Sequence, residues 1–60
     1  MSSDVIIRNF KRSKMEKVLE MRKQGLSTET IGDAVGRNAR TIQRYLRVFN
    51  IYGITAFAKD

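Results

Sequence analysis

Apolar residues recur at helical spacing in three segments of the chain, and local signals mark where each segment begins and ends. In the first, the residues from Ser13 to Glu16 have the S-x-x-E pattern of a capping box, in which both ends satisfy free backbone amides. Gly25 follows a basic run, a combination that is typical of a helix end. The pattern predicts a helix over residues 13–24.

Two further helices are expected close behind the first. Ser27 is a second candidate N-cap and Gly36 ends the next apolar pattern, which predicts a helix over residues 28–35. Its apolar stripe consists of Ile31, Ala34 and Val35. Asn38 is a third candidate N-cap and predicts a helix over residues 39–49, so that only a tight turn separates the last two helices.

The third predicted helix has two distinct faces at about 100° per residue. Its apolar side, with Tyr45 at the border, consists of Ile42, Leu46 and Phe49. Its polar side consists of Arg40, Gln43, Arg44 and Arg47. A solvated face usually mixes charges of both signs, but no acidic residue occurs between positions 34 and 59. This face therefore favours an anionic partner.

The two ends of the chain are less regular. Residues 1–12 carry an apolar trio, Val5 to Ile7, followed by basic residues, and they fit a flexible arm, a short strand or an extra helical turn. After a turn at Gly53, the apolar tail predicts a packed strand or helical turn. We divide the chain into an N-terminal arm, residues 1–12, and one domain, residues 13–60.

Composition narrows the classes of function. The 60 residues carry 12 Lys and Arg against 6 Asp and Glu, a net charge of +6 that favours a polyanionic partner. Along the first predicted helix the basic residues alternate with Glu16 and Glu20, so we expect solvated i,i+4 ion pairs there. With no Cys and no His, disulfides and Cys/His zinc sites are excluded. We expect no enzyme activity, metal, cofactor or small-molecule substrate, because a domain of 60 residues has little room for a deep pocket.

Nothing in the sequence predicts contact with a membrane. No segment reaches the roughly 18 apolar residues that a spanning helix needs. The start lacks the basic and apolar regions of a signal peptide. We expect a cytoplasmic protein, in the host cytoplasm or associated with the nucleoid.

Two short helices joined by a tight turn, the second with a basic outer face, suit DNA for a physical reason. The major groove is about 12 Å wide and admits one helix, while the preceding helix braces against the backbone. The stretch from Gly25 to Leu46 resembles the helix-turn-helix of transposases, resolvases and phage or bacterial repressors. The positions that carry the resemblance are Gly25-Leu26-Ser27, Ile31-Gly32, Val35-Gly36-Arg37-Asn38, Thr41-Ile42 and Arg44-Tyr45-Leu46. Gly32 departs from the usual Ala, at a cost of about 1 kcal/mol in helix propensity.

The resemblance implies a set of contacts to DNA. Base contacts fall on Asn38, Ala39, Arg40, Thr41, Gln43 and Arg44. Phosphate contacts fall on Ser27, Thr28, Arg37 and Arg47. Arg40 and Arg44 can each bond guanine O6 and N7, and Gln43 can bond adenine N6 and N7. We expect the arginine lower on the helix, Arg47, to meet phosphate.

We therefore expect an all-α fold of three helices with a short N-terminal arm and an apolar C-terminal tail. The expected function is sequence-specific binding of double-stranded DNA, as a small transcriptional regulator of phage or mobile-element type. One recognition helix covers few base pairs, so we expect a homodimer that uses the apolar ends, Val5 to Ile7 and residues 51–58.

Three alternatives remain open. The first keeps DNA binding but makes the protein a recombination accessory factor or the DNA-binding part of a transposase. The second is a ribbon-helix-helix repressor with residues 4–10 as the DNA-reading strand, which leaves the basic third helix unexplained. The third is a basic protein-interaction module that does not bind DNA.

Overall fold

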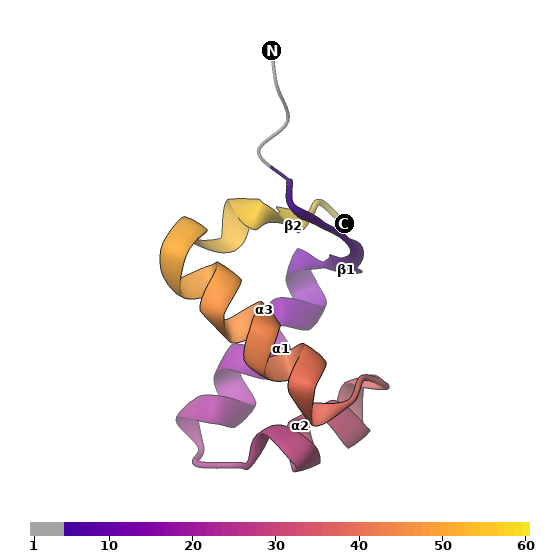
Figure 1. The fold of residues 1–60 in the computed structure, drawn as a ribbon, viewed down its shortest axis with the longest axis vertical. Helices are drawn as coiled ribbons and strands as arrows, with labels where there is room; N and C mark the ends of the chain where they lie inside the picture. Colours follow the sequence, from indigo (N-terminus) through magenta and orange to yellow (C-terminus); the bar gives the residue numbers. More distant parts are fainter. Residues whose placement is uncertain (1–4) are drawn as a thin grey trace.

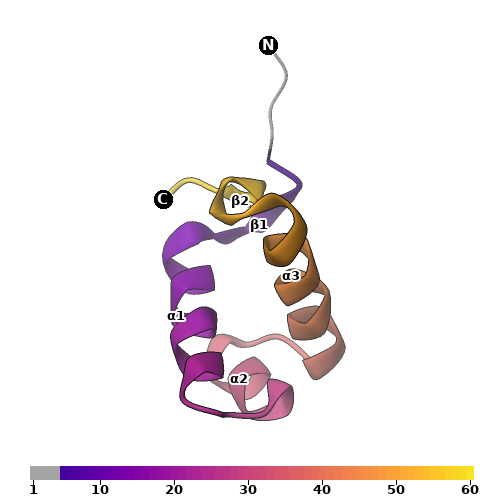
Figure 2. The ribbon, with the colours of Figure 1, turned by 90° about the vertical axis from the view of Figure 1, so that its left-hand side faces the viewer.

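The computed structural model describes residues 5–60, and the first four residues of the predicted arm lie outside this range. In chain order, the described residues form β1 (Ile7–Lys11), α1 (Arg12–Lys23), α2 (Thr28–Val35), α3 (Ala39–Tyr52), the 3-10 helix η1 (Ile54–Ala56) and β2 (Phe57–Ala58). In Figure 1 and Figure 2, α2 lies at one end of the domain and the two strands lie at the other. Figure 2 shows α1 and α3 on opposite sides between these ends.

The α2–α3 pair forms as its local signals predict. The Ser27 side chain accepts the N–H of Thr30, and α2 ends at Gly36, whose backbone is left-handed with φ of 77°. The Asn38 side chain accepts the N–H of Thr41 at 2.8 Å and caps α3. The predicted range of α2 is confirmed, and α3 continues three residues beyond its predicted end, to Tyr52.

The start of α1 differs from the prediction. The helix begins at Arg12, directly after β1, and Lys11 occupies the N-cap position without a side-chain hydrogen bond. Ser13 therefore lies inside the first turn, and the predicted capping box is wrong. The backbone N–H of Ser13 donates instead to the Asp60 carboxylate at 3.0 Å, a contact between residues 47 positions apart. An acid at a helix N-terminus is favourable because of the helix dipole.

The two ends of the chain pair as a parallel two-stranded sheet, so the all-α prediction holds for the helices but not for the ends. Ile7 of β1 stands opposite Phe57 of β2, and the register is irregular between Ile7 and Lys11. The Ile6 N–H donates to the Ala56 carbonyl at 2.8 Å. Arg12 Nε donates to the Phe57 carbonyl at 2.9 Å and ties α1 to the same strand.

The core lies between the three helices and the sheet. Its buried apolar residues are Ile7, Phe10, Met15, Val18, Ile31, Val35, Ile42, Tyr45, Ala56 and Phe57. Phe10, Tyr45 and Phe57 form an aromatic cluster with ring centroids 4.6, 5.9 and 6.3 Å apart. Tyr45, predicted at the border of the apolar face, is thus a core residue.

Much of the apolar surface expected for dimerisation is used within the chain. Ile7, Ala56 and Phe57 are buried in the core that both ends share. Of the residues that the structure describes, the large apolar side chains that stay exposed are Ile6, Ile51 and Tyr52. Among the described residues, no helix is both long enough and apolar enough to cross a bilayer.

Candidate nucleic-acid interface

The exposed side of α3 carries a row of three arginines. Arg40, Arg44 and Arg47 are exposed, while Ile42 on the opposite side of the helix is fully buried. Within residues 5–60, none of the three guanidinium groups forms a hydrogen bond or ion pair with another part of the chain. Their donors are therefore free to bond base edges or phosphate oxygens.

The N-terminus of α2 lies beside this row. Gln43 Nε2 reaches Thr28 Oγ1 at 3.5 Å, a contact that brings α3 to the first residue of α2. Ser27 caps α2 from the neighbouring position, and both residues carry hydroxyl groups. Because a helix N-terminus presents free N–H groups and the positive end of the dipole, this corner suits a phosphate. We call the exposed α3 side and this corner the recognition face.

The remaining predicted base contacts lie at the start of α3. Asn38 is exposed, but its side-chain oxygen is occupied by the N–H of Thr41. Ala39 and Thr41 are half-buried in the first turn. This end of α3 is where helix-turn-helix proteins commonly approach bases.

Arg37 is the predicted contact that the structure sets apart. Its guanidinium turns toward β1, where Nη2 donates to the Asn9 carbonyl at 3.0 Å. Nη1 donates to the Gly36 carbonyl at 3.2 Å, and the group lies 5.4 Å from the Phe10 ring centroid. These contacts hold Arg37 against β1, and its contact with phosphate stays a prediction.

The surface of α1 also differs from its prediction. The expected i,i+4 ion pairs with Glu16 and Glu20 are not formed, because no acid–base pair in the described range lies within 4.0 Å. Residues 5–60 also bring no three His, Cys, Asp or Glu side chains together as a candidate metal site.

These features define a class of protein. Two helices joined by a left-handed glycine turn, with the second helix exposing arginines beside the N-terminus of the first, form a helix-turn-helix domain of the DNA-binding class. The turn at Gly36 and the pairing of β1 within its own chain are unlike the ribbon-helix-helix alternative, which needs a strand exchanged between subunits.

Comparison with known families agrees with the geometry. The profile of the homeodomain-like domain matches residues 8–58, a range that includes all of α1, α2 and α3. The chain therefore belongs to the homeodomain-like family. No curated protein and no solved structure matches the chain.

Proposed function

We propose that the domain binds double-stranded DNA sequence-specifically, with α3 in the major groove, and acts as a small transcriptional regulator of phage or mobile-element type. The observation that carries this proposal is the recognition face, where three α3 arginines without a partner among residues 5–60 lie beside the capped N-terminus of α2. Support also comes from the acid-free sequence between positions 34 and 59, which leaves the arginines of α3 without an opposing charge in their own segment.

The proposed contacts divide by position on the recognition face. Arg40 and Arg44 read guanine through bidentate hydrogen bonds, each worth about 1–3 kcal/mol of discrimination. Gln43 reads adenine, and Asn38, Ala39 and Thr41 lie against the bases at the start of α3. Ser27, Thr28 and Arg47 hold the backbone phosphates and fix the orientation of α3 in the groove.

DNA binding alone accounts for the side chains on the recognition face. Arginine, glutamine and hydroxyl side chains recognise phosphates and base edges without bond-breaking chemistry, so the proposed role is non-catalytic and uses no metal, cofactor or small-molecule substrate.

We further propose that the active species is a homodimer in the cytoplasm. One recognition helix covers few base pairs, and dimers commonly bind half-sites about 34–36 Å apart. The exposed apolar residues available for this contact are Ile6, Ile51 and Tyr52. Ile51 and Tyr52 sit at the C-terminal end of α3, so a contact there would fix the spacing between two recognition helices.

Selection from a pool of randomised duplexes tests the proposal. We expect a recovered site of defined sequence, with twofold symmetry if the protein binds as a dimer. The logarithm of the affinity should fall linearly with the logarithm of salt concentration. Recovery of no consensus, together with salt-insensitive association, would instead support the protein-interaction module. Footprinting on host DNA separates the regulator, which protects promoters, from a recombination factor, which protects attachment or element ends.

A further inference from the structure

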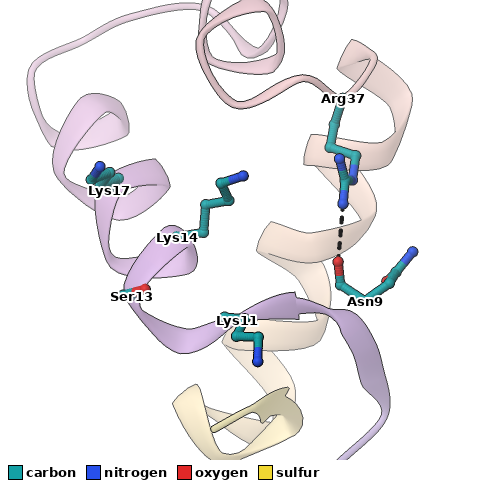
Figure 3. A pocket seen from close by; sticks show the side chains of 6 residues that line it. All are labelled: Asn9, Lys11, Ser13, Lys14, Lys17 and Arg37. Carbon is teal, nitrogen blue, oxygen red and sulfur yellow. Dashed lines mark hydrogen bonds between the residues drawn. The ribbon is translucent and has the colours of Figure 1, made fainter. Parts of the chain in front are cut away.

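A basic cleft with a volume of about 190 Å³ opens between β1, the first part of α1 and the turn that joins α2 to α3. Its lining residues, shown in Figure 3, are Asn9, Lys11, Ser13, Lys14, Lys17 and Arg37. Four of these are basic and none is acidic. The cleft is smaller than the roughly 300–1,000 Å³ of pockets for drug-sized ligands, so it suits one small group of a larger molecule.

The cleft concentrates positive charge that the chain leaves largely uncompensated. Lys14 and Lys17 form no ion pair with any described residue, and in Figure 3 the Lys14 side chain extends across the cleft toward Arg37. An acid beside the cleft, Asp60, accepts the Ser13 N–H, and the charge of Lys11 helps to lower the pKa of its carboxyl. Like charges that line one cleft repel one another, and a bound anion would relieve that repulsion.

Arg37 is already positioned for such an anion. Its bonds to the carbonyls of Asn9 and Gly36 and its place over the Phe10 ring fix the guanidinium plane. A guanidinium has five N–H donors, and these two bonds leave three of them available. Because the side chain is held before any ligand arrives, less conformational entropy is lost on binding.

The cleft opens on a different side of α3 from the arginine row. Tyr45 Oη approaches Asn9 Oδ1 at 3.5 Å, so this side of α3 faces β1 and the cleft. Arg44, the preceding residue, projects about 100° away around the helix axis. Gln43, a further 100° around, faces Thr28 at the opposite flank. The cleft and the arginine row therefore face different directions around α3.

We propose that this basic cleft binds a backbone phosphate of a second segment of duplex DNA, so that one domain holds two DNA segments together. The choice of DNA as the anion rests on the proposed function. Lys14, Lys17 and Arg37 would bond the phosphate oxygens, as expected for charge-assisted contacts between cations and phosphate. Binding at the cleft is independent of base sequence, because only phosphate is contacted.

Amide NMR spectra of the isotope-labelled protein can follow the two faces separately. A short duplex of arbitrary sequence should shift the amides of residues 39–47 and also those of residues 9–17 and 37. The triple variant R40A/R44A/R47A should keep the second set of shifts. The double variant K14A/K17A should keep the first set and weaken the second about tenfold or more, because hydrogen bonds to charged groups are strong.

The matched control is Lys23→Ala, which removes an exposed cation at the far end of α1 and should leave the cleft affinity unchanged. If a duplex shifts only residues 39–47, the cleft proposal is overturned. It is also overturned if inorganic phosphate or polyglutamate shifts the cleft amides while the duplex does not. The ligand of the cleft would then be a free anion or an acidic protein. Cleft shifts without recognition-face shifts would refute the proposed function and, with it, the holding of two segments, and would leave the cleft as a phosphate-binding site.

Discussion

The carbonyl oxygen of Arg37 lies so close to Gly32 that a β-carbon at position 32 would overlap it. Gly32 is buried in α2, and its own carbonyl accepts the Arg37 N–H at 2.8 Å. The two contacts fold the turn after α2 back against that helix. The missing side chain at position 32 therefore helps to set the path from α2 into α3, and with it the direction of the recognition face.

Gly32→Ala should consequently destabilise the domain, against the usual trend. In an ordinary helix interior, Ala is more favourable than Gly by about 1 kcal/mol. Here the added methyl meets backbone atoms of Arg37 and Asn38, which cannot rotate aside as a flexible side chain would. We expect a loss of about 1–3 kcal/mol, as for other overpacked sites. Urea unfolding followed by circular dichroism measures the change.

Asp33→Ala provides the control for Gly32→Ala. Asp33 neighbours Gly32 in α2 but is exposed, so its replacement should alter the free energy of unfolding by no more than about 0.5 kcal/mol. A Gly32→Ala variant as stable as the wild type would show that the turn can move away from α2 without cost.

The helix pair could be predicted from sequence because its determinants are local. Ser27 and Asn38 each cap a helix through an N–H three residues ahead, and Gly36 supplies the left-handed turn between them. The arginine row could likewise be predicted, since it depends only on the period of α3. Gly32 departs from the family pattern, but its close approach to Arg37 joins two segments of the backbone and has no local signal.

The ends of the chain could not be predicted in the same way. Phe10 and Phe57 meet in the core although 47 positions separate them, and an apolar segment gives no indication of whether it will pack within its chain or on a partner. Asp60 capping α1 is a contact of the same long-range kind. The orientation of Arg37 depends on where β1 lies, so its bond to the Asn9 carbonyl could not be seen in the sequence either.

Phe10→Ala tests whether residues 7–11 are integral to the domain. Phe10 is 1% exposed and contacts both Tyr45 and Phe57, so its truncation should cost about 3–5 kcal/mol. A loss of that size would leave a domain of 60 residues largely unfolded, visible as collapse of the dispersed NMR spectrum. Arg8→Ala, at an exposed position of the same strand, should fold normally. Equal stability of the two variants would place residues 7–11 outside the folded core.

Asn38 combines a cap with a proposed base contact, and two substitutions can separate these roles. Asn38→Ala removes the acceptor for the Thr41 N–H and should cost about 0.5–2 kcal/mol of stability. Asn38→Asp keeps a good N-cap and should retain the thermal midpoint, yet its negative charge should weaken DNA binding. Calorimetry and a fluorescence binding assay measure the two effects. DNA affinity unchanged in Asn38→Asp would exclude position 38 from the interface.

The contact between Asp60 and α1 predicts a dependence of stability on pH. Hydrogen bonds from the Ser13 side chain and backbone N–H, aided by Lys11 and Arg12, hold the pKa of the Asp60 carboxyl below its ordinary value. Because the folded pKa is the lower one, the stabilisation is complete above the unfolded pKa and is lost as the pH falls through the folded pKa.

Two measurements check the role of Asp60. The stability difference between the wild type and Asp60→Asn should be present at neutral pH and should shrink in acid. The carboxyl carbon of Asp60, followed by NMR, should titrate at a lower pH in the native protein than in urea. Titration at the same pH in both conditions would mean that the carboxylate does not hold the Ser13 N–H in solution.

Arg44 and Arg47 lie on one exposed face of α3, less than one turn apart, and should nevertheless respond differently to removal. Arg44→Ala should lose about 1–3 kcal/mol on the selected site and much less on unrelated duplexes, because a base contact is removed. Arg47→Ala should weaken binding to all sequences similarly and reduce the salt slope by about 1, because a phosphate contact is removed. Titrations of selected and scrambled duplexes at several salt concentrations measure both effects. If both variants lose the same affinity on every sequence, α3 contacts only the backbone and does not read bases from the major groove.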